Sequence, residues 1–155
     1  MTSFLPRRSR GKKVCGSLRV SAVKKNKMKI NDITYAINGA VFEVNSILGP
    51  GFLEKVYENA LLVELKKRGL KAKNQVPITV LYKGEVVGDY TADLLVEDKV
   101  IVELKTVENL DRAHEAQLLN YLKATGRHVG LLVNFKHKKA DIKRMVLDLA
   151  EGHEG

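Results

Sequence analysis

The chain has 155 residues, enough for one domain with a core of its own, and 45% hydrophobic and 29% charged residues are ordinary for a globular protein. Cys15 is the only cysteine, so an intramolecular disulfide is excluded and a reducing, cytoplasmic location is favoured. No apolar stretch approaches the roughly 20 residues that cross a bilayer, so we expect no membrane partner.

The net charge of +9 belongs to the start of the chain. Residues 1–28 contain nine basic residues and no acidic one, whereas from residue 29 onward 18 basic residues balance the 18 acidic ones. We therefore expect a basic, unstructured arm over residues 1–28, one domain over residues 29–150 and a tail over residues 151–155. The arm either contacts nucleic-acid phosphates or is a leader without a role, including one that arises from a start codon placed upstream of a true first residue, Met28.

Apolar periodicity predicts two helices at the start of the domain. The first ends at the glycine and proline after Leu48, and its apolar positions recur every three or four residues, at Ile33, Ile37, Val41, Val44 and Leu48. The second covers residues 53–68. Its apolar face is assigned to Val56, Ala60, Leu61, Val63 and Leu65.

Beyond Gly69 the period changes to that of strands. Three strands in succession form a meander: one that begins after Pro77, one over residues 86–96 with a bulge or bend at Gly88, and one over residues 100–107.

The rest of the chain returns to alternating elements. A helix over residues 111–125 precedes an apolar strand over residues 129–135, which is typical of a central strand, and a last helix covers residues 139–150. The order α-α-β-β-β-α-β-α predicts an α/β (α+β) fold in which helices flank a mixed sheet of about four strands.

Three charged residues stand inside apolar strand segments: Asp93 in the second strand, and Glu103 and Lys105 in the third. Charged side chains rarely lie next to a core unless they are paired or bind a metal. Residues two apart in a strand share a face, so Glu103 and Lys105 point the same way and Val102 and Leu104 point into a core. One interpretation is a half-exposed ion pair, and the other is a site for a divalent cation.

The register of the second and third strands decides between these interpretations. If residues 97–99 form a three-residue loop, Val96 pairs with Val100 and Asp93 falls opposite Glu103. Opposed carboxylates destabilise a sheet unless a cation lies between them. A two-residue loop would instead send the two acids to opposite faces.

Residues outside this pair can complete such a site. Lys105 can stabilise a hydroxide or hold a phosphate oxygen, which suits phosphodiester hydrolysis beside a metal. Glu54 begins the second helix, where an acid either favours the helix dipole or serves as a further metal ligand. Gln117 is either solvated or orients a water or a phosphate, and Tyr121 shares its helix face one turn later. We find no pattern typical of a nucleophilic triad, a zinc cluster or a phosphate-binding loop.

At these residues the sequence resembles the PD-(D/E)XK nuclease superfamily, through Asp93, then Glu103-Leu104-Lys105, then Gln117 on the next helix. More specifically, it resembles the GxxExxY family, whose motif here is Gly51-Phe52-Leu53-Glu54-Lys55-Val56-Tyr57. Members of that family often carry a histidine before the Leu-Gly-Pro-Gly turn, where this chain has Asn45.

The resemblance implies a restriction-endonuclease-like core that binds Mg²⁺, for which Mn²⁺ can substitute. It implies that Asp93 and Glu103 are metal ligands, with Glu54 as a further acid ligand. It also implies a catalytic role for Lys105 and an accessory one for Gln117. The substrate contacts are expected to come from Lys105, Gln117, Tyr121 and Tyr57.

The leading hypothesis is therefore a metal-dependent phosphodiesterase, endonuclease-like or exonuclease-like, that acts on nucleic acid, with DNA favoured over RNA. The alternative is a non-catalytic module that keeps the nuclease-like fold and binds nucleic acid or a protein. The zero net charge of the domain argues against strong unaided DNA binding. A homodimer that pairs through an exposed strand edge or the first helix is a further expectation.

Overall fold

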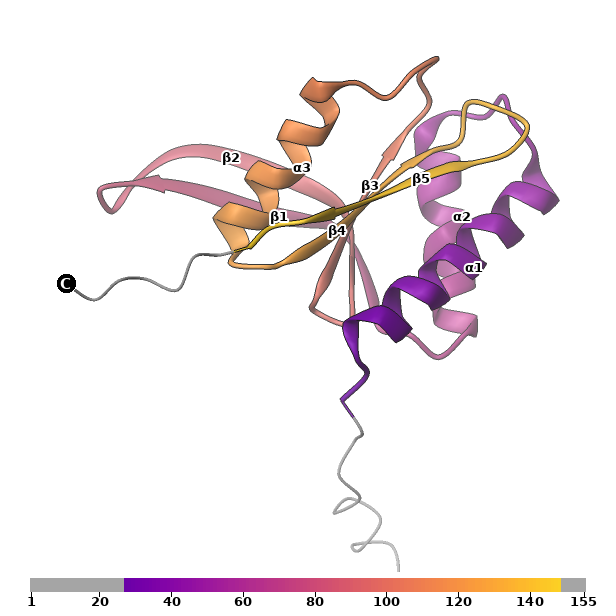
Figure 1. The fold of residues 1–155 in the computed structure, drawn as a ribbon, viewed down its shortest axis with the longest axis horizontal. Coiled ribbons are helices and arrows are strands. Elements are labelled where there is room, and N and C mark those ends of the chain that lie inside the picture. The colour runs from indigo at the N-terminus through magenta and orange to yellow at the C-terminus, as the bar shows by residue number, and fades with distance from the viewer. Residues whose placement is uncertain (1–26, 149–155) are drawn as a thin grey trace, which may run out of the picture.

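A five-stranded mixed sheet with helices on both faces organises the domain in a computed structural model that describes residues 27–148 (Figure 1). Its elements are α1 (Ile30–Leu48), α2 (Glu54–Lys67), β1 (Ala72–Tyr82), β2 (Glu85–Val96), β3 (Val100–Lys105), α3 (Arg112–Thr125), β4 (Val129–Asn134) and β5 (Asp141–Val146). The expected basic arm, except for its last two residues, and the expected tail lie outside the described residues. None of the helices described is long and apolar enough to cross a membrane.

The strands lie side by side in their sequence order, β1-β2-β3-β4-β5. All neighbours are antiparallel except β3 and β4, which are parallel because α3 carries the chain back across the sheet between them. The meander and the helical crossover are therefore confirmed, and so is the mixed α+β architecture.

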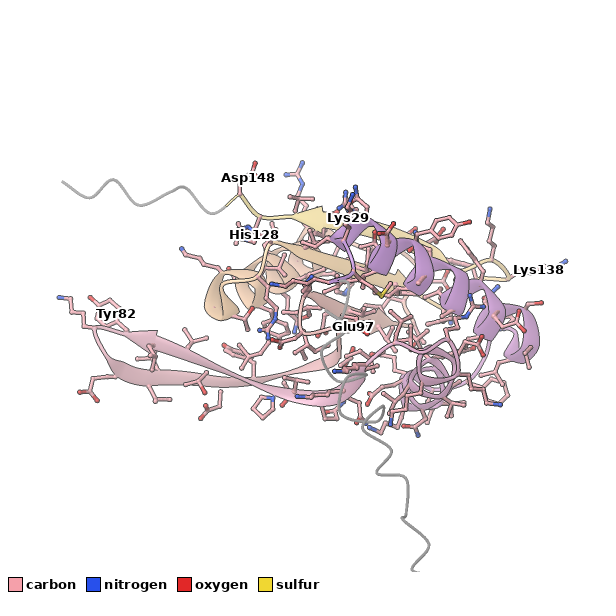
Figure 2. All side chains as sticks on the ribbon, turned by 90° about the horizontal axis from the view of Figure 1, so that it is seen from below. Lys29, Tyr82, Glu97, His128, Lys138 and Asp148 are labelled. Carbon is pink, nitrogen blue, oxygen red and sulfur yellow. The ribbon has the colours of Figure 1, made fainter. Side chains whose placement is uncertain are left out.

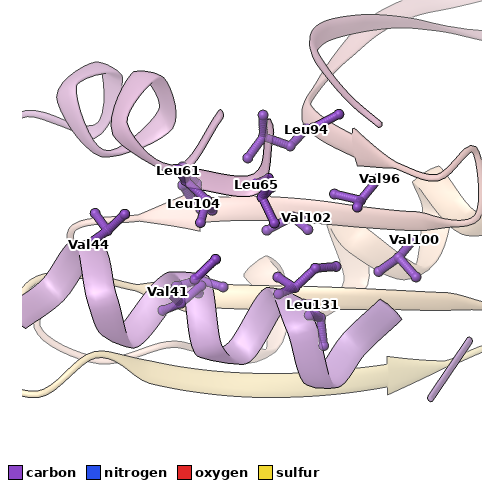
Figure 3. Packing of buried hydrophobic residues seen from close by; sticks show 14 of the residues in the cluster. Val41, Val44, Leu61, Leu65, Leu94, Val96, Val100, Val102, Leu104 and Leu131 are labelled. Carbon is purple, nitrogen blue, oxygen red and sulfur yellow. The ribbon is translucent and has the colours of Figure 1, made fainter. Parts of the chain in front are cut away.

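The sheet separates two hydrophobic cores. On one face, α1 and α2 pack against the even-numbered residues of β3, among them Val102 and Leu104 (Figure 3). On the other face, α3 packs against Ile101 and Leu132 through residues such as Leu118 and Leu122. Glu103 and Lys105 have the parity of Ile101, so they lie on the α3 face, with the apolar residues of β3 turned away from them as expected.

The predicted last helix is wrong, because residues 141–146 form the edge strand β5 instead. The residue spacing that suggested a helical face is also compatible with a strand. Ile142 packs on the α1–α2 side of the sheet and Met145 on the α3 side, as alternation in a strand requires. Strand β5 pairs with β4 along its whole length, and this satisfies the backbone N–H and C=O groups on the outer edge of β4, which a helix would have left without partners. The sheet consequently has five strands and not about four.

Two local expectations for α2 and β1 also need correction. Helix α2 turns Tyr57, Glu58, Leu61 and Leu65 inward, whereas Val56 and Val63 are exposed. Strand β1 begins well before Pro77, which the sheet accommodates because β1 is an edge strand and needs no N–H group on its outer side.

The β1–β2 hairpin extends beyond the body of the domain and carries Tyr82 near its free end (Figures 1 and 2). A register shift leaves Val87 as an extra residue beside Gly88, which confirms the expected bulge. Helix α3 packs along this hairpin, so the two form one side of the molecule.

The hairpin changes its inner face at one point, where Gln75 and Asp93 stand opposite each other without joining the ladder. In a regular strand all even-numbered residues would share a face. Here Ala72 and Leu94 pack on the α1–α2 side, whereas Ile78 and Ala92 pack on the α3 side. Gln75 has a φ of 49°, in the left-handed region, which marks the backbone irregularity that lets the strands rotate.

Candidate active site

Asp93 and Glu103 meet where β2 and β3 separate. Val96 pairs with Val100, which confirms the register expected for a three-residue loop, and the ladder ends at Leu94 and Val102. One position further, each carboxylate accepts a hydrogen bond from the opposite strand. The Asp93 N–H donates to Glu103 Oε1 at 3.1 Å, and the Leu104 N–H donates to Asp93 Oδ2 at 2.8 Å.

The two acids hold protons more tightly than ordinary carboxyl groups. Burial raises the pKa of Asp93, although the Leu104 N–H opposes the shift. Burial, followed by the nearby charge of Asp93, raises the pKa of Glu103 to about 8. Two ionised carboxylates are therefore unfavourable here, and a bound cation would remove both the repulsion and part of the desolvation cost.

Lys105 is held by an ordered chain of polar groups on α3. Its Nζ donates to Gln117 Oε1 at 3.1 Å, and Gln117 Nε2 donates to the Tyr121 hydroxyl at 3.0 Å. Burial, and then the charge of Glu103, raises the pKa of Tyr121, so its hydroxyl keeps its proton near neutral pH. The structure thus brings together Glu103, Lys105, Gln117 and Tyr121 from β3 and α3.

Glu54 approaches the same place from the N-terminus of α2. Burial raises the pKa of Glu54, while the charge of Lys105 lowers it and that of Asp93 raises it. Within residues 27–148, however, no three acidic, histidine or cysteine side chains lie close enough to form a ready-made metal cage. The two carboxylates of β2 and β3 nonetheless suit a hard divalent ion that keeps several water ligands, which is the usual coordination of Mg²⁺.

The expected substrate contact by Tyr57 is wrong. Its side chain is fully buried, stacks on Phe135 with ring centroids 4.4 Å apart, and donates its hydroxyl proton to the Gly49 carbonyl at 2.6 Å. The same hydroxyl accepts a hydrogen bond from the Phe52 N–H at 3.2 Å. Tyr57 therefore fixes the glycine-containing turn that leads into α2 and does not face a substrate.

Glu58 is the residue of this region that the sequence analysis missed. It is 4% exposed and accepts hydrogen bonds from Lys55 Nζ, Asn74 Nδ2 and Gln75 Nε2, at 2.8, 3.2 and 2.9 Å. Neighbouring strand residues normally point to opposite faces, so Asn74 and Gln75 reach one carboxylate only because Gln75 adopts a left-handed conformation. The only available signal was that Glu58 follows Glu54 by one helical turn.

Two asparagines, the buried Asn134 and the half-buried Asn45, support the surrounding chain. Asn134 pairs with Lys105 across β3 and β4, and its side chain accepts from the Val107 N–H and donates to the Val107 carbonyl, at 3.1 and 2.7 Å. It therefore fixes the segment that follows Lys105. Asn45 donates to the Lys138 carbonyl at 3.0 Å, a tie between α1 and the loop before β5 rather than a contact with the acids.

Comparison with known proteins agrees with this geometry at the level of the fold. The crystal structure of SSO0001 is similar with a TM-score of 0.50 and 20% identity over 78% of this chain and 60% of that one, so the chain spans about three fifths of that relative. An alkaline exonuclease (LHK-Exo) from Laribacter hongkongensis gives a TM-score of 0.42 and 11% identity, over 77% of this chain and 83% of the exonuclease. Curated proteins gave no match.

A sequence profile covers most of the domain. The profile of the PD-(D/E)XK nuclease superfamily matches residues 31–145, a span that contains both opposed acids, Lys105 and Gln117. The restriction-endonuclease-like core is thereby confirmed together with the sheet and its flanking helices. The chain belongs to the PD-(D/E)XK nuclease superfamily.

Proposed function

We propose that this protein is a Mg²⁺-dependent nuclease of the GxxExxY family that hydrolyses nucleic-acid phosphodiester bonds, with DNA as the favoured substrate. The observation that carries the proposal is the position of Asp93 opposite Glu103 at the point where β2 and β3 separate. An arrangement that only stabilised the fold would not keep two carboxylates together at a site where burial raises the pKa of both.

The proposed metal ligands are Asp93 and Glu103, with Glu54 as the third acid. A divalent ion held there would polarise the phosphate and lower the pKa of a water molecule. Both carboxylates are fixed by backbone N–H groups, and each has a second oxygen that these hydrogen bonds do not use. The chain therefore presents oriented ligands before the ion arrives, which limits the ordering cost of binding.

Lys105 provides the positive charge of the site. Its ammonium group lies on the face of Glu103 and is held by Gln117, so it can stabilise an attacking hydroxide or the negative charge that develops on a phosphate oxygen. Gln117 in turn is oriented by Tyr121, which fixes the amide oxygen toward Lys105. In this arrangement Gln117 acts as a positioning residue for the lysine.

Cleavage of a panel of nucleic acids tests this proposal. Supercoiled plasmid and labelled DNA and RNA oligonucleotides are incubated with Mg²⁺ or Mn²⁺ and the wild type, Asp93→Asn or Asp89→Asn. Asp93→Asn keeps an acceptor for the Leu104 N–H but removes the charge, and we expect it to lower the cleavage rate by about 100-fold or more. Asp89 is exposed on the same strand, so Asp89→Asn should cleave like the wild type. Wild-type protein without activity on any substrate, or cleavage that survives Asp93→Asn, contradicts the proposal.

A further inference from the structure

A cavity of about 950 Å³ lies between the β1–β2 hairpin and α3, directly beside the candidate active site. We call it the hairpin groove. Its walls come from Thr79, Val80, Leu81, Val87, Gly88 and Tyr90 on the hairpin and from Ala113, Ala116, Gln117, Asn120, Tyr121, Lys123 and Ala124 on α3. Gln117 and Tyr121 belong to both sites, so an occupant of the groove would reach the polar chain that holds Lys105.

The lining of the hairpin groove combines flat aromatic, apolar and hydrogen-bonding groups, and none of its residues is acidic. Tyr90 is 51% exposed, and its ring lies 5.7 Å from that of Tyr121 at an angle of 47°. Gln117 and Asn120 supply amide groups, and Lys123 supplies a positive charge. A lining that contains a lysine and no acidic residue favours binding of a negatively charged nucleic-acid backbone. Exposed aromatic rings can stack on planar nucleobases.

The hairpin holds Tyr90 in place before any ligand binds. A Cβ atom at Gly88 would come within 3.0 Å of the Tyr90 ring, so the glycine is what allows the ring to lie close against the strand. A ring packed in this way loses little conformational entropy when a base stacks on it.

We propose that the hairpin groove binds unpaired nucleobases of the strand whose phosphate reaches Lys105, so that the substrate is single-stranded nucleic acid or carries a single-stranded segment. The proposal rests on the proposed nuclease function and narrows its substrate class. In a duplex each base already stacks on its neighbours and only its edges are accessible, so Tyr90 could stack only on a base that has left the duplex.

Binding measured by fluorescence anisotropy in EDTA tests the groove without cleavage. The probes are a labelled single-stranded DNA, the blunt duplex of the same sequence, and the same single strand with abasic sites in place of its central bases. The wild type should prefer the single strand over both the duplex and the abasic strand. Tyr90→Ala should weaken single-strand binding by about tenfold, the usual effect of losing one stacking partner, whereas Tyr90→Phe should restore it. Tyr35→Ala serves as the matched control, because Tyr35 is 82% exposed on α1, across the sheet.

A second variant fills the groove without removing a ring. Ala116 is an exposed residue of α3 that lines the cavity, and leucine suits a helix, so Ala116→Leu should fold normally and also weaken single-strand binding. Wild-type protein that does not bind the single strand, or that binds it no better than the duplex or the abasic strand, overturns the proposal. A dimer in sedimentation equilibrium that dissociates in Tyr90→Ala also overturns it, because the groove would then belong to a second copy of the chain.

The outcomes separate the groove from the nuclease. In one outcome, cleavage depends on metal and is lost in Asp93→Asn, but single-strand binding is unchanged by Tyr90→Ala and by the abasic sites. This outcome overturns the proposed role of the hairpin groove and leaves the proposed function intact. In the other outcome, the wild type binds the single strand through Tyr90 but cleaves no substrate. This outcome overturns the proposed nuclease function and leaves the groove as a site that binds single-stranded nucleic acid.

Discussion

Glu103 is buried at a position where its own charge opposes folding. Its side chain lies beside Asp93. One backbone N–H donates to each carboxylate, and the positive charge of Lys105 offsets a further part of the cost of burial. Burial makes the ionised form of Glu103 costly and raises its pKa to about 8. A residue of this kind lowers the stability of the metal-free protein and is typical of positions kept for chemistry.

The first prediction concerns the pH dependence of stability in the absence of metal. Because folding raises the pKa of Glu103 from 4.5 to about 8, the folded state binds its proton more tightly, so its contribution to stability is full below pH 4.5 and is lost as the pH rises through 8. The raised pKa of Asp93 acts in the same direction. Glu103→Gln keeps the acceptor for the Asp93 N–H and cannot ionise. We expect it to raise the free energy of unfolding at pH 9 by about 1–4 kcal/mol and to change it little at pH 4.5.

Urea denaturation in EDTA at the two pH values provides the measurement. Glu108→Gln is a suitable control, because Glu108 is an exposed acid in the loop after β3. A Glu103→Gln protein less stable than the wild type at pH 9 would show instead that the fold compensates the ionised carboxylate well.

At the scale of elements, α3 packs closely against β4 on the active-site face of the sheet. A Cβ atom at Gly130 would lie 2.8 Å from Leu118 Cδ1, 3.0 Å from Cγ and 3.1 Å from Cδ2. The whole end of the Leu118 side chain would have to move, and it is buried among its neighbours. Gly130 therefore sets how closely α3, with Gln117 and Tyr121, sits above β3 and β4.

The second prediction follows from this contact. Gly130→Ala should lower the free energy of unfolding by about 1–3 kcal/mol, because overpacking forces Leu118 or α3 to shift. Gly39→Ala is the matched control: its new Cβ meets only the guanidinium of Arg68, the flexible end of an exposed side chain, and alanine favours helix α1. Thermal and urea denaturation of both variants measure the effect. Equal stability of the two variants would contradict the prediction, because it would mean that α3 or Leu118 can move away from the new methyl group without a loss of folding free energy.

The element that sequence patterns assigned wrongly shows the limit of local information. The segment 141–146 is short, and its apolar spacing suits either a helix or a strand. The free edge of β4 decided between them, and that edge exists only after α3 has brought β4 beside β3. Similarly, the inward face of α2 follows from how Tyr57 packs on Phe135, a residue 78 positions later in the chain.

At the scale of the whole molecule, the candidate site gathers residues from α2, β2, β3 and α3. It lies where the hairpin changes its inner face, so the same irregularity that frees Asp93 from the ladder turns the outer part of the hairpin toward α3. The position of the acids and the hairpin groove are therefore two consequences of one rotation of the strands.

The third prediction concerns the stability of the whole domain with metal. An ion that binds only the folded state stabilises it by mass action, so Mn²⁺ or Mg²⁺ at about 100 times its dissociation constant should add about 2.7 kcal/mol, or roughly 10 °C in Tm. Asp93→Asn should lose this gain, and Asp89→Asn should retain it. Calorimetry or thermal fluorescence with and without the ion gives the measurement. An equal rise in Tm in the wild type and both variants would show that the ion binds at a site other than Asp93.

The sequence by itself determined the meander and the crossover helix, because these depend on turns, periodicity and residues close together in the chain. It left the register of β2 against β3 open between a two-residue and a three-residue loop, and the tertiary structure decided it. The sequence also singled out Asp93, Glu103 and Lys105, since charged groups in apolar segments stand out locally, and it pointed to Gln117 through the pattern of the superfamily that the chain resembles. Only the tertiary structure decided the identity of β5, the burial of Tyr57, the network around Glu58 and the hairpin groove. Each of these depends on surfaces that residues distant in the sequence create when they pack together, and no local pattern encodes such a surface.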